Sequence, residues 1–151
     1  MGLEFKIKSL KDFQEESKWL WNLHYDEIAQ NKHAIELDVD FESYQKMDAA
    51  GILYIVTIED ENKIVGYYIA IVMPHIRYKK SLTATTDLYY LHPDYRKAWI
   101  GTKLFRFVEE DLKKRGVERM IVTTKVKLDN SPIFERLNWV FTEKLYTKLI
   151  K

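Results

Sequence analysis

The segment "DLYYLHPDYRKAWIGTKLFRFVEEDLKKRG", from Asp87 to Gly116, gives the main indication of the fold. It begins as an apolar strand and breaks at Pro93, because proline has no N–H group to donate to a sheet. A basic loop follows. From Thr102 onward, apolar residues recur at helical spacing until Gly116, which is a typical helix C-cap. The stretch therefore predicts a strand, a tight loop and a helix in direct succession.

The loop in this stretch has the properties of an anion site. The first N–H groups of a helix lack intrahelical partners, and the helix dipole adds positive potential there. Gly101 lets the backbone come close to a ligand, and Arg96, Lys97 and Lys103 add positive charge. Together these features suit a pyrophosphate. The loop lacks the G-x-x-x-x-G-K-[ST] pattern of nucleotide-binding P-loops.

The composition excludes several classes of protein. The chain has 151 residues and a net charge of +1, so we expect one domain over residues 1–151 and no strong attraction to nucleic acid. It has no cysteine, which removes disulfides, thiol nucleophiles and thiolate metal sites. No apolar run is long enough to span a bilayer, and the segment "MGLEFKIKSL" does not read as a signal peptide. We therefore expect a cytoplasmic protein without membrane partners.

Hydrophobic periodicity predicts the remaining elements. Period-two segments indicate strands at residues 3–10, 52–59, 63–73, 81–91, 119–125 and 139–151. Helical spacing indicates helices at 11–29, 41–50, 102–115 and 131–138. The order β-α-α-β-β-β-α-β-α-β predicts a mixed α/β fold, that is, a mixed sheet covered by helices. The helix between the fourth and fifth strands favours a right-handed crossover between parallel neighbours.

The loop, read as Arg96–Lys97–Ala98–Trp99–Ile100–Gly101, resembles the acetyl-CoA loop of the GNAT superfamily of N-acetyltransferases. That signature has Arg or Gln, two residues, Gly, one residue, and Gly or Ala; Trp99 departs from it at the first Gly. The segments "LYYLHPDYR" and "PIFERLNWVF" are similar to further family segments, and the resemblance covers most of the chain. Four short segments also resemble sequences of short GNAT-like proteins of bacteriophages: "HYDEIA", "PHIRYKKSLTA", "HPDYRK" and "FERLNW".

The resemblance implies a fold and a donor. The fold would be a central mixed sheet of six to seven strands flanked by about four helices, and the co-substrate would be acetyl-CoA. Main-chain groups at Leu91 and His92 would contact the pantetheine and the thioester. The pyrophosphate would be held by the loop and the first helical turn, namely Arg96, Lys97, Ala98, Trp99, Ile100, Gly101, Thr102 and Lys103.

The implied chemistry is direct attack of an amine on the thioester, which calls for a base. Asp87, on the strand before the loop, is one candidate, and the alternative is a structural carboxylate. His75, at the end of the neighbouring strand, is the other candidate, and the alternative there is a structural histidine. His24 and Tyr25 lie on the first long helix, which borders the acceptor site in this family. Their alternative role is packing on the sheet.

The tyrosine that often acts as the acid in this family falls on Phe134, which cannot donate a proton. Tyr146 or Tyr90 would have to replace it if an acid is needed. The scattered histidines give no spacing typical of a metal site.

Two functions remain open from the sequence. One is an acetyl-CoA-dependent N-acetyltransferase that acts on a primary amine. The other is a GNAT-shaped acyl-CoA-binding or host-protein-interaction module with little turnover, which the departures at Trp99 and Phe134 favour. The acceptor, whether a small molecule or a protein amine, and the oligomeric state cannot be read from the sequence.

Overall fold

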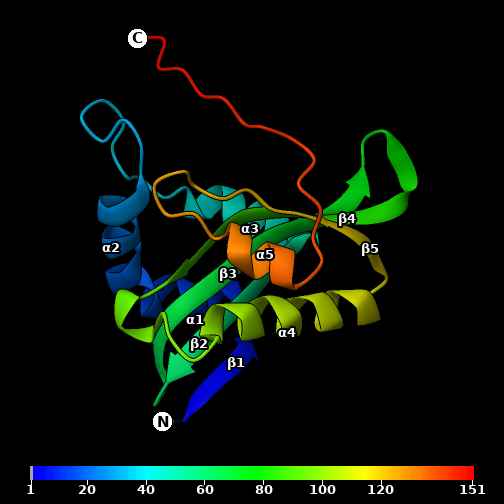
Figure 1. Ribbon diagram of the computed structural model, residues 1–151, viewed down its shortest axis with the longest axis horizontal. Coiled ribbons are helices and arrows are strands. Elements are labelled where there is room, and N and C mark those ends of the chain that lie inside the picture. Colours follow the sequence, from blue (N-terminus) through cyan, green and yellow to red (C-terminus); the bar gives the residue numbers. More distant parts are fainter. Residues whose placement is uncertain (1) are drawn as a thin grey trace.

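The computed structural model describes residues 2–151 and consists of one sheet with helices on both faces (Figure 1). The strands follow one another across the sheet in chain order. Neighbours are antiparallel from the first strand to the fourth, and the last pair is parallel. The mixed fold class is confirmed, but the described residues form five strands rather than six or seven: β1 Leu3–Ile7, β2 Leu53–Asp60, β3 Lys63–His75, β4 Tyr78–Leu91 and β5 Val117–Ile121.

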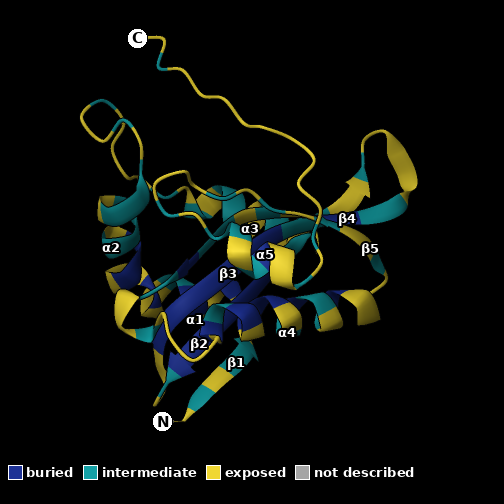
Figure 2. Cartoon of the chain, viewed as in Figure 1, coloured by how far each residue is buried: buried dark blue, intermediate teal, exposed yellow. Residues whose placement is uncertain are grey.

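Different helices cover the two faces of this sheet. The helices are α1 Leu10–Glu16, α2 Lys18–Ile28, α3 Phe41–Ala49, α4 Ile100–Lys114 and α5 Ser131–Arg136, with a short 3-10 turn, η1, at Pro93–Tyr95. One buried cluster joins α4 and α5 to β2, β3 and β4, and contains Tyr68, Phe105 and Val108. The second cluster joins α1 and α2 to the opposite face of the same strands. Figure 2 shows that the central strands are buried between these two layers.

The predicted helix at 11–29 is two helices, because Ser17 interrupts it. The Ser17 hydroxyl donates to the Phe13 carbonyl oxygen at 2.5 Å and accepts from Trp21 Nε1 at 3.0 Å. A serine that bonds back to the preceding turn competes with helix hydrogen bonds and bends the axis. Ser17 is fully buried, so these bonds also satisfy its hydroxyl. The single helix predicted from periodicity is therefore corrected to α1 and α2.

Several local signals of the sequence have the expected structural effect. The Asp40 carboxylate accepts from Ser43 N at 2.9 Å and caps α3. Glu61 and Asn62 have positive φ values of 48° and 68° in the β2–β3 turn, as a tight hairpin requires. Gly116, at φ 86°, ends α4 in the left-handed conformation.

Two irregularities in β4 shape the region where the site lies. In the pairing with β3, Ile69 lies opposite Leu88 and Ala70 lies opposite Thr86, so Asp87 is an additional, bulged residue. The pairing with β5 ends at Thr85, opposite Ile121. Beyond Thr85, β4 therefore continues to Leu91 without β5 beside it. The backbone on that edge of β4 is left open toward the helices.

The strand predicted at residues 139–151 is absent, and this accounts for the lower strand count. Trp139 is anchored by its N–H, which donates to the Phe134 carbonyl oxygen at 2.8 Å, and by Nε1, which donates to Glu109. The residues after it have no regular secondary structure and are mostly exposed. A strand forms only where a neighbouring edge accepts its hydrogen bonds, and this segment has no such neighbour within the described chain.

Among residues 2–151, no helix combines the length and apolar character needed to cross a bilayer.

Candidate active site

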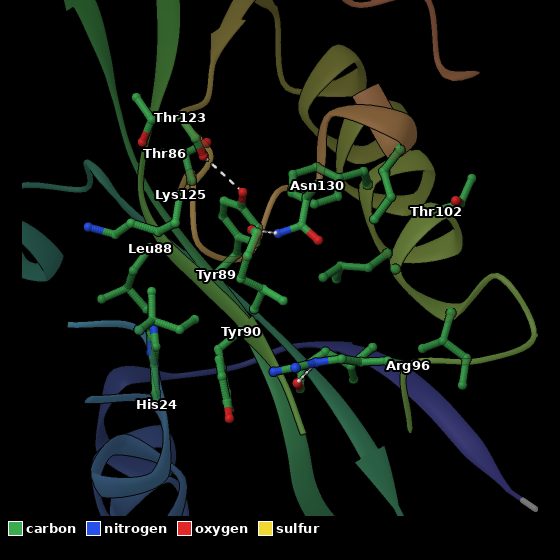
Figure 3. A pocket seen from close by; sticks show the side chains of 18 of the residues that line it. His24, Thr86, Leu88, Tyr89, Tyr90, Arg96, Thr102, Thr123, Lys125 and Asn130 are labelled. Carbon is green, nitrogen blue, oxygen red and sulfur yellow. Dashed lines mark hydrogen bonds between the residues drawn. The ribbon is translucent and has the colours of Figure 1, made fainter. Parts of the chain in front are cut away.

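A pocket of about 320 Å³ opens where β4 parts from β5 (Figure 3). Its walls come from residues 86–91 of β4, the start of α4, the loop after β5, and α5. His24 of α2 and Asp87 also line it. Of the predicted cofactor residues, the pocket is lined by Leu91, Arg96, Lys97, Trp99, Ile100, Gly101 and Thr102. His92, Ala98 and Lys103 lie outside this lining.

The start of α4 leaves backbone N–H groups available at the pocket. The N-cap is Trp99, which has φ 61° and provides no side-chain capping bond. Ile100 N donates to the Lys97 carbonyl oxygen at 3.1 Å, and the first intrahelical bond runs from Lys103 N to the Trp99 carbonyl oxygen at 2.9 Å. Helix geometry therefore leaves the N–H groups of Gly101 and Thr102 without intrahelical partners. An uncapped helix N-terminus beside a pocket is suited to an anion.

Trp99, which replaces the first glycine of the family signature, holds an arginine next to this helix end. The Arg136 guanidinium lies 3.8 Å from the centre of the Trp99 ring and donates to Thr102 Oγ1 at 3.1 Å. Both residues line the pocket, and Trp99 is 60% exposed. Arg136 was missed in the sequence, because the segment "PIFERLNWVF" was read as a helix similar to a family segment and its charge was not connected with the loop.

Arg96 has a different main partner from the one predicted. Its guanidinium forms a two-pronged ion pair with Glu27 of α2, at 2.6 and 2.7 Å, and Nε donates to the Leu91 carbonyl oxygen at 2.9 Å. The Tyr90 hydroxyl donates to the same carboxylate at 2.5 Å. The hydrogen bonds from Arg96, opposed by partial burial, lower the pKa of Glu27 to about 2. The Arg96 side chain thus connects the loop to α2. An anion in the pocket would be bound by backbone N–H groups and by other cations instead.

The two residues predicted to contact the thioester through their main chain, Leu91 and His92, differ in which N–H group is available. His92 N donates to the Val65 carbonyl oxygen at 2.8 Å, so this N–H is already used in the β3–β4 ladder. Its ring accepts from Asp94 N at 3.2 Å and caps η1. Because N–H groups alternate sides along a strand, the Leu91 N–H points away from β3. The His92 N–H is therefore engaged within the sheet, and Leu91 has the N–H on the open edge.

Gly101 is small for a packing reason that the sequence did not reveal. Its φ lies outside the left-handed region. A Cβ built on it would come 2.9 Å from Ile133 Cδ1 of α5. The glycine therefore allows the first turn of α4 to lie close to α5, at a position that also lines the pocket.

His24 is the one predicted acceptor-site residue that lines the pocket. Its Nδ1 lies 2.7 Å from the Tyr67 hydroxyl, and its ring stacks on Tyr90 with centroids 4.5 Å apart. Burial, together with the nearby cations Lys125 and Arg96, lowers the pKa of His24 to about 4, and Glu27 opposes this shift. His24 is therefore neutral at pH 7.

The tautomer of His24 follows from its partner. Tyr67 is fully buried, and its hydroxyl hydrogen needs an acceptor. The acceptor in contact is His24 Nδ1. The His24 proton then lies on Nε2, so the ring offers a hydrogen-bond donor. Tyr25, by contrast, lies outside the pocket lining, and its hydroxyl donates to the Ile35 carbonyl oxygen at 2.5 Å, which holds the loop after α2.

The two candidate bases occupy different places. Asp87 lies in the pocket at the β4 bulge and accepts a hydrogen bond from the Tyr44 hydroxyl of α3. Burial, reinforced by this bond, raises the pKa of Tyr44. His75 lies at the β3–β4 hairpin, where its Nδ1 accepts from Arg77 N at 3.1 Å, and it does not line the pocket. The geometry thus favours Asp87.

Neither tyrosine considered as an acid has a free hydroxyl in the pocket. Phe134 is buried and packs on Phe105 with ring centroids 4.9 Å apart. Tyr146 is on the exposed C-terminal segment, outside the pocket lining. Tyr90 lines the pocket, but its hydroxyl donates to Glu27. Burial is the main cause that raises the pKa of Tyr90, and the hydrogen bond to Glu27 adds to the shift. Within residues 2–151, no cluster of three or more possible metal ligands is found.

Several solved structures share this fold. A predicted acetyltransferase from Clostridium acetobutylicum, solved with acetyl-CoA, has a TM-score of 0.71 and 15% identity, with 97% of this chain and 96% of that chain covered. A ribosomal-protein-alanine N-acetyltransferase from Brucella melitensis has a TM-score of 0.75 and 14% identity, with 99% and 100% covered. Glucosamine-6-phosphate N-acetyltransferase from Arabidopsis thaliana has a TM-score of 0.73 and 14% identity, with both chains fully covered.

At these identities the solved structures support the fold alone. No curated protein sequence matches the chain. The model of the acetyltransferase (GNAT) family, however, matches residues 13–137. This match includes α2, the bulged strand β4, the uncapped start of α4 and the segment through α5. The chain therefore belongs to the acetyltransferase (GNAT) family.

Proposed function

We propose that the protein transfers an acetyl group from acetyl-CoA to a primary amine. The observation that carries this proposal is the uncapped start of α4, which faces a pocket that continues along the open edge of β4. An anion site and an apolar channel with free backbone N–H groups match the two ends of acetyl-CoA, its pyrophosphate and its pantetheine thioester. Membership in the family supports the same reaction class.

The donor is proposed to lie along the length of this pocket. The N–H groups of Gly101 and Thr102 would bind pyrophosphate oxygens, with Lys97 and Arg136 adding positive charge. The pantetheine would follow β4 beyond the end of its pairing with β5. The Leu91 N–H would then polarise the thioester oxygen as negative charge develops on it.

The acceptor amine needs to lose a proton before it can attack. An alkylamine with a pKa near 10.4 is only about 1 part in 2,500 neutral at pH 7, a handicap of roughly 4.6 kcal/mol. We assign the base to Asp87, because it is the bulged carboxylate in the pocket. Tyr44 fixes the orientation of that carboxylate by donating to one oxygen, which leaves the second oxygen for the amine or for a bridging water.

Transfer then proceeds without a protein acid. Asp87 takes one proton from the ammonium form of the acceptor, directly or through water, and the neutral amine nitrogen then bonds to the carbonyl carbon. When the tetrahedral intermediate collapses, the carbon–sulfur bond breaks, and the second proton lost by the nitrogen passes to water or to the released thiolate. The sulfur leaves as a thiolate, whose conjugate acid has a pKa of about 8.5, so it needs less protonation than an alkoxide. The presence of the buried Phe134 in place of a tyrosine is compatible with this route.

The acceptor is proposed to be a small-molecule or protein amine that enters at the end of the pocket formed by His24 and Asp87. Two proteins of similar fold are named for such acceptors, a ribosomal-protein alanine in one case and glucosamine-6-phosphate in the other. The neutral His24 ring, with its proton on Nε2, would donate to an oxygen of the acceptor. Its proposed role is recognition rather than proton removal.

Release of CoA thiol is the experiment that tests this function. The chain has no cysteine, so every thiol that reacts with a colorimetric disulfide reagent in the assay comes from CoA. We expect thiol release from acetyl-CoA that increases when a panel of primary amines is added, with an equal amount of acetylated amine detected by mass spectrometry. A protein that binds acetyl-CoA but acetylates no member of a broad panel, including peptides and amino sugars, would contradict the proposal.

A further inference from the structure

Two consecutive residues before α4 have a backbone conformation that suits glycine. Ala98 has φ 52°, and Trp99 has φ 61° and ψ 21°, which is the left-handed helical region. Residues with a large side chain rarely adopt this region, because their Cβ comes too close to the following carbonyl oxygen. Trp99 therefore keeps the backbone turn that a glycine would make at this position, and it differs from glycine by the ring that it adds to the loop.

The Trp99 ring contacts an arginine from another element rather than the core. The ring is 60% exposed, and the Arg136 guanidinium of α5 lies 3.8 Å from its centre. A cation at this distance over an aromatic face is attracted by the negative potential of the ring. The same guanidinium donates to Thr102 Oγ1 at 3.1 Å. Arg136 is thus held between a ring of the loop and a hydroxyl in the first turn of α4, and all three residues line the pocket.

The charge of Arg136 is available to a ligand. Within residues 2–151, no carboxylate lies at ion-pair distance from Arg136. Arg96, the other arginine that lines the pocket, is paired with Glu27 at 2.6 Å. A guanidinium has five N–H donors, and the bond to Thr102 uses one of them. Arg136 can therefore still donate two parallel hydrogen bonds to a phosphate group.

We propose that Trp99 is a positioning residue for the donor: it holds the Arg136 guanidinium beside the first turn of α4, where Arg136 binds the pyrophosphate of acetyl-CoA. This inference rests on the proposed function. Glu27 keeps Arg96 at α2, so a cation from α5 takes the place at the phosphates. A guanidinium that the ring already holds in place loses less conformational freedom when the ligand binds, and this pre-organisation increases the affinity.

A double-mutant cycle on the affinity for acetyl-CoA, measured by calorimetry, tests the proposal. Trp99→Gly removes the ring and fits a φ of 61° without steric cost, so the variant should stay folded by circular dichroism. It should bind acetyl-CoA about tenfold more weakly, as expected for the loss of a cation–aromatic contact that orders a binding group. Arg136→Gln should have a similar effect. The double variant should bind no more weakly than Arg136→Gln alone, because Trp99 acts through Arg136.

Three controls separate this role from a general effect on the loop. Lys97→Gln changes a cation that lines the pocket but is not stacked on Trp99, so Trp99→Gly should cause its full loss of affinity in the Lys97→Gln background as well. Trp99→Phe keeps a ring face for the guanidinium and should lose less affinity than Trp99→Gly. Arg136→Gln should weaken the binding of dephospho-CoA as much as that of CoA, because both carry the pyrophosphate.

A measurement without ligand tests the contact itself. In the free protein, the ring current of Trp99 should shift the side-chain proton resonances of Arg136 upfield, and Trp99→Gly should abolish this shift. The proposal is overturned if the shift is absent, if Trp99→Gly costs the same affinity in the Arg136→Gln background, if Trp99→Phe and Trp99→Gly are equally weak, or if Arg136→Gln leaves dephospho-CoA binding unchanged. A wild type that binds no acetyl-CoA would instead contradict the proposed function, and this inference with it.

Discussion

Asp87 is the residue on which the proposed chemistry depends, and its place at a β-bulge makes a sharp prediction. Asp87→Asn keeps the shape of the side chain but removes the base. We expect the rate of acetyl transfer to fall by about 10²–10⁴ near neutral pH, and by less at high pH, where the amine is already neutral. The affinity for acetyl-CoA should hardly change, because Asp87 is not at the proposed pyrophosphate site. Rates over a pH series, with calorimetric affinities, measure both effects.

Two variants serve as controls for Asp87. Tyr44→Phe removes the hydrogen bond to the carboxylate but leaves the carboxylate itself, so it should have a smaller effect on the rate than Asp87→Asn. His75→Gln changes the other candidate, which does not line the pocket, and should leave the rate unchanged. If His75→Gln were the variant that lost activity, the base would be assigned to the wrong residue.

His24 predicts a pH dependence of stability. Burial lowers its pKa from 6.5 to about 4 in the folded chain. Between these two values the unfolded chain binds a proton that the folded chain does not, so stability is complete above about pH 6.5 and falls as the pH drops toward 4. The whole shift corresponds to roughly 3 kcal/mol. His24→Phe keeps the stack on Tyr90 but cannot titrate, so its free energy of unfolding should fall less between pH 7 and pH 5.

Urea unfolding of both proteins across this pH range measures the difference. The lost bond to Tyr67 lowers the stability of His24→Phe at every pH, so the comparison is between slopes and not between absolute values. Parallel curves for the two proteins would show that His24 is not held neutral by the fold.

At the scale of elements, the contact between α4 and α5 explains why residue 101 is glycine. A Cβ at this position meets Ile133 Cδ1, the end of a side chain that can adjust. We expect Gly101→Ala to stay folded with a stability change of at most about 1 kcal/mol, because small overpacking is partly relieved by movement of a flexible neighbour. Ile133→Val combined with Gly101→Ala should recover the stability that Gly101→Ala alone loses. Thermal unfolding of the two single variants and of the double variant measures the coupling free energy between positions 101 and 133.

Acetyl-CoA affinity of these Gly101 variants separates packing from ligand contact. If α5 is the constraint, Gly101→Ala should still bind acetyl-CoA, and Gly101→Val should regain binding when Ile133 is shortened. If Gly101→Ala stays folded but loses binding and Ile133→Val does not restore it, the ligand itself must lie against the Cα of Gly101.

The sequence was informative about elements whose signals are local. The caps at Asp40 and Gly116 and the hairpin at Glu61–Asn62 depend on neighbouring residues, and they were predictable for that reason. The helix break at Ser17 was missed, because it depends on where a buried hydroxyl finds its partners. The final strand was predicted from alternation alone, which shows that a segment can form a strand but not which edge accepts it.

At the scale of the whole molecule, the candidate site also combines features that depend on local sequence with features that depend on the packing of distant residues. The loop from Arg96 to Gly101, which follows a strand, and the carboxylate of Asp87, which lies on that strand, were singled out as candidates from the local sequence. The partners Glu27 and Arg136 were not, since they are distant from the loop in sequence and come together only when α2 and α5 pack around it. Burial of His24 against Tyr67 likewise needs the folded sheet. Local sequence therefore indicates candidate groups, and packing determines which of them remain free to bind or react.

Ligand binding should stabilise the whole molecule if the pocket holds the donor. Acetyl-CoA at about 100 times its Kd should raise the free energy of unfolding by about 2.7 kcal/mol, since it binds the folded chain and not the unfolded one. Adenosine, which lacks the phosphates, should give a much smaller shift in Tm. Equal shifts with both compounds would indicate a site that does not use the start of α4.

The most direct test of the central claim, that the pocket between β4 and the start of α4 binds acetyl-CoA, is isothermal titration calorimetry. We expect one site per chain for acetyl-CoA and for CoA, with affinity that falls as salt is added, because phosphate charges contribute to binding. Arg136→Gln, which removes a cation next to Thr102, should weaken the affinity and reduce this salt dependence. The absence of any binding heat with millimolar acetyl-CoA or CoA, from a protein that is folded by circular dichroism, would show that the pocket does not bind the donor.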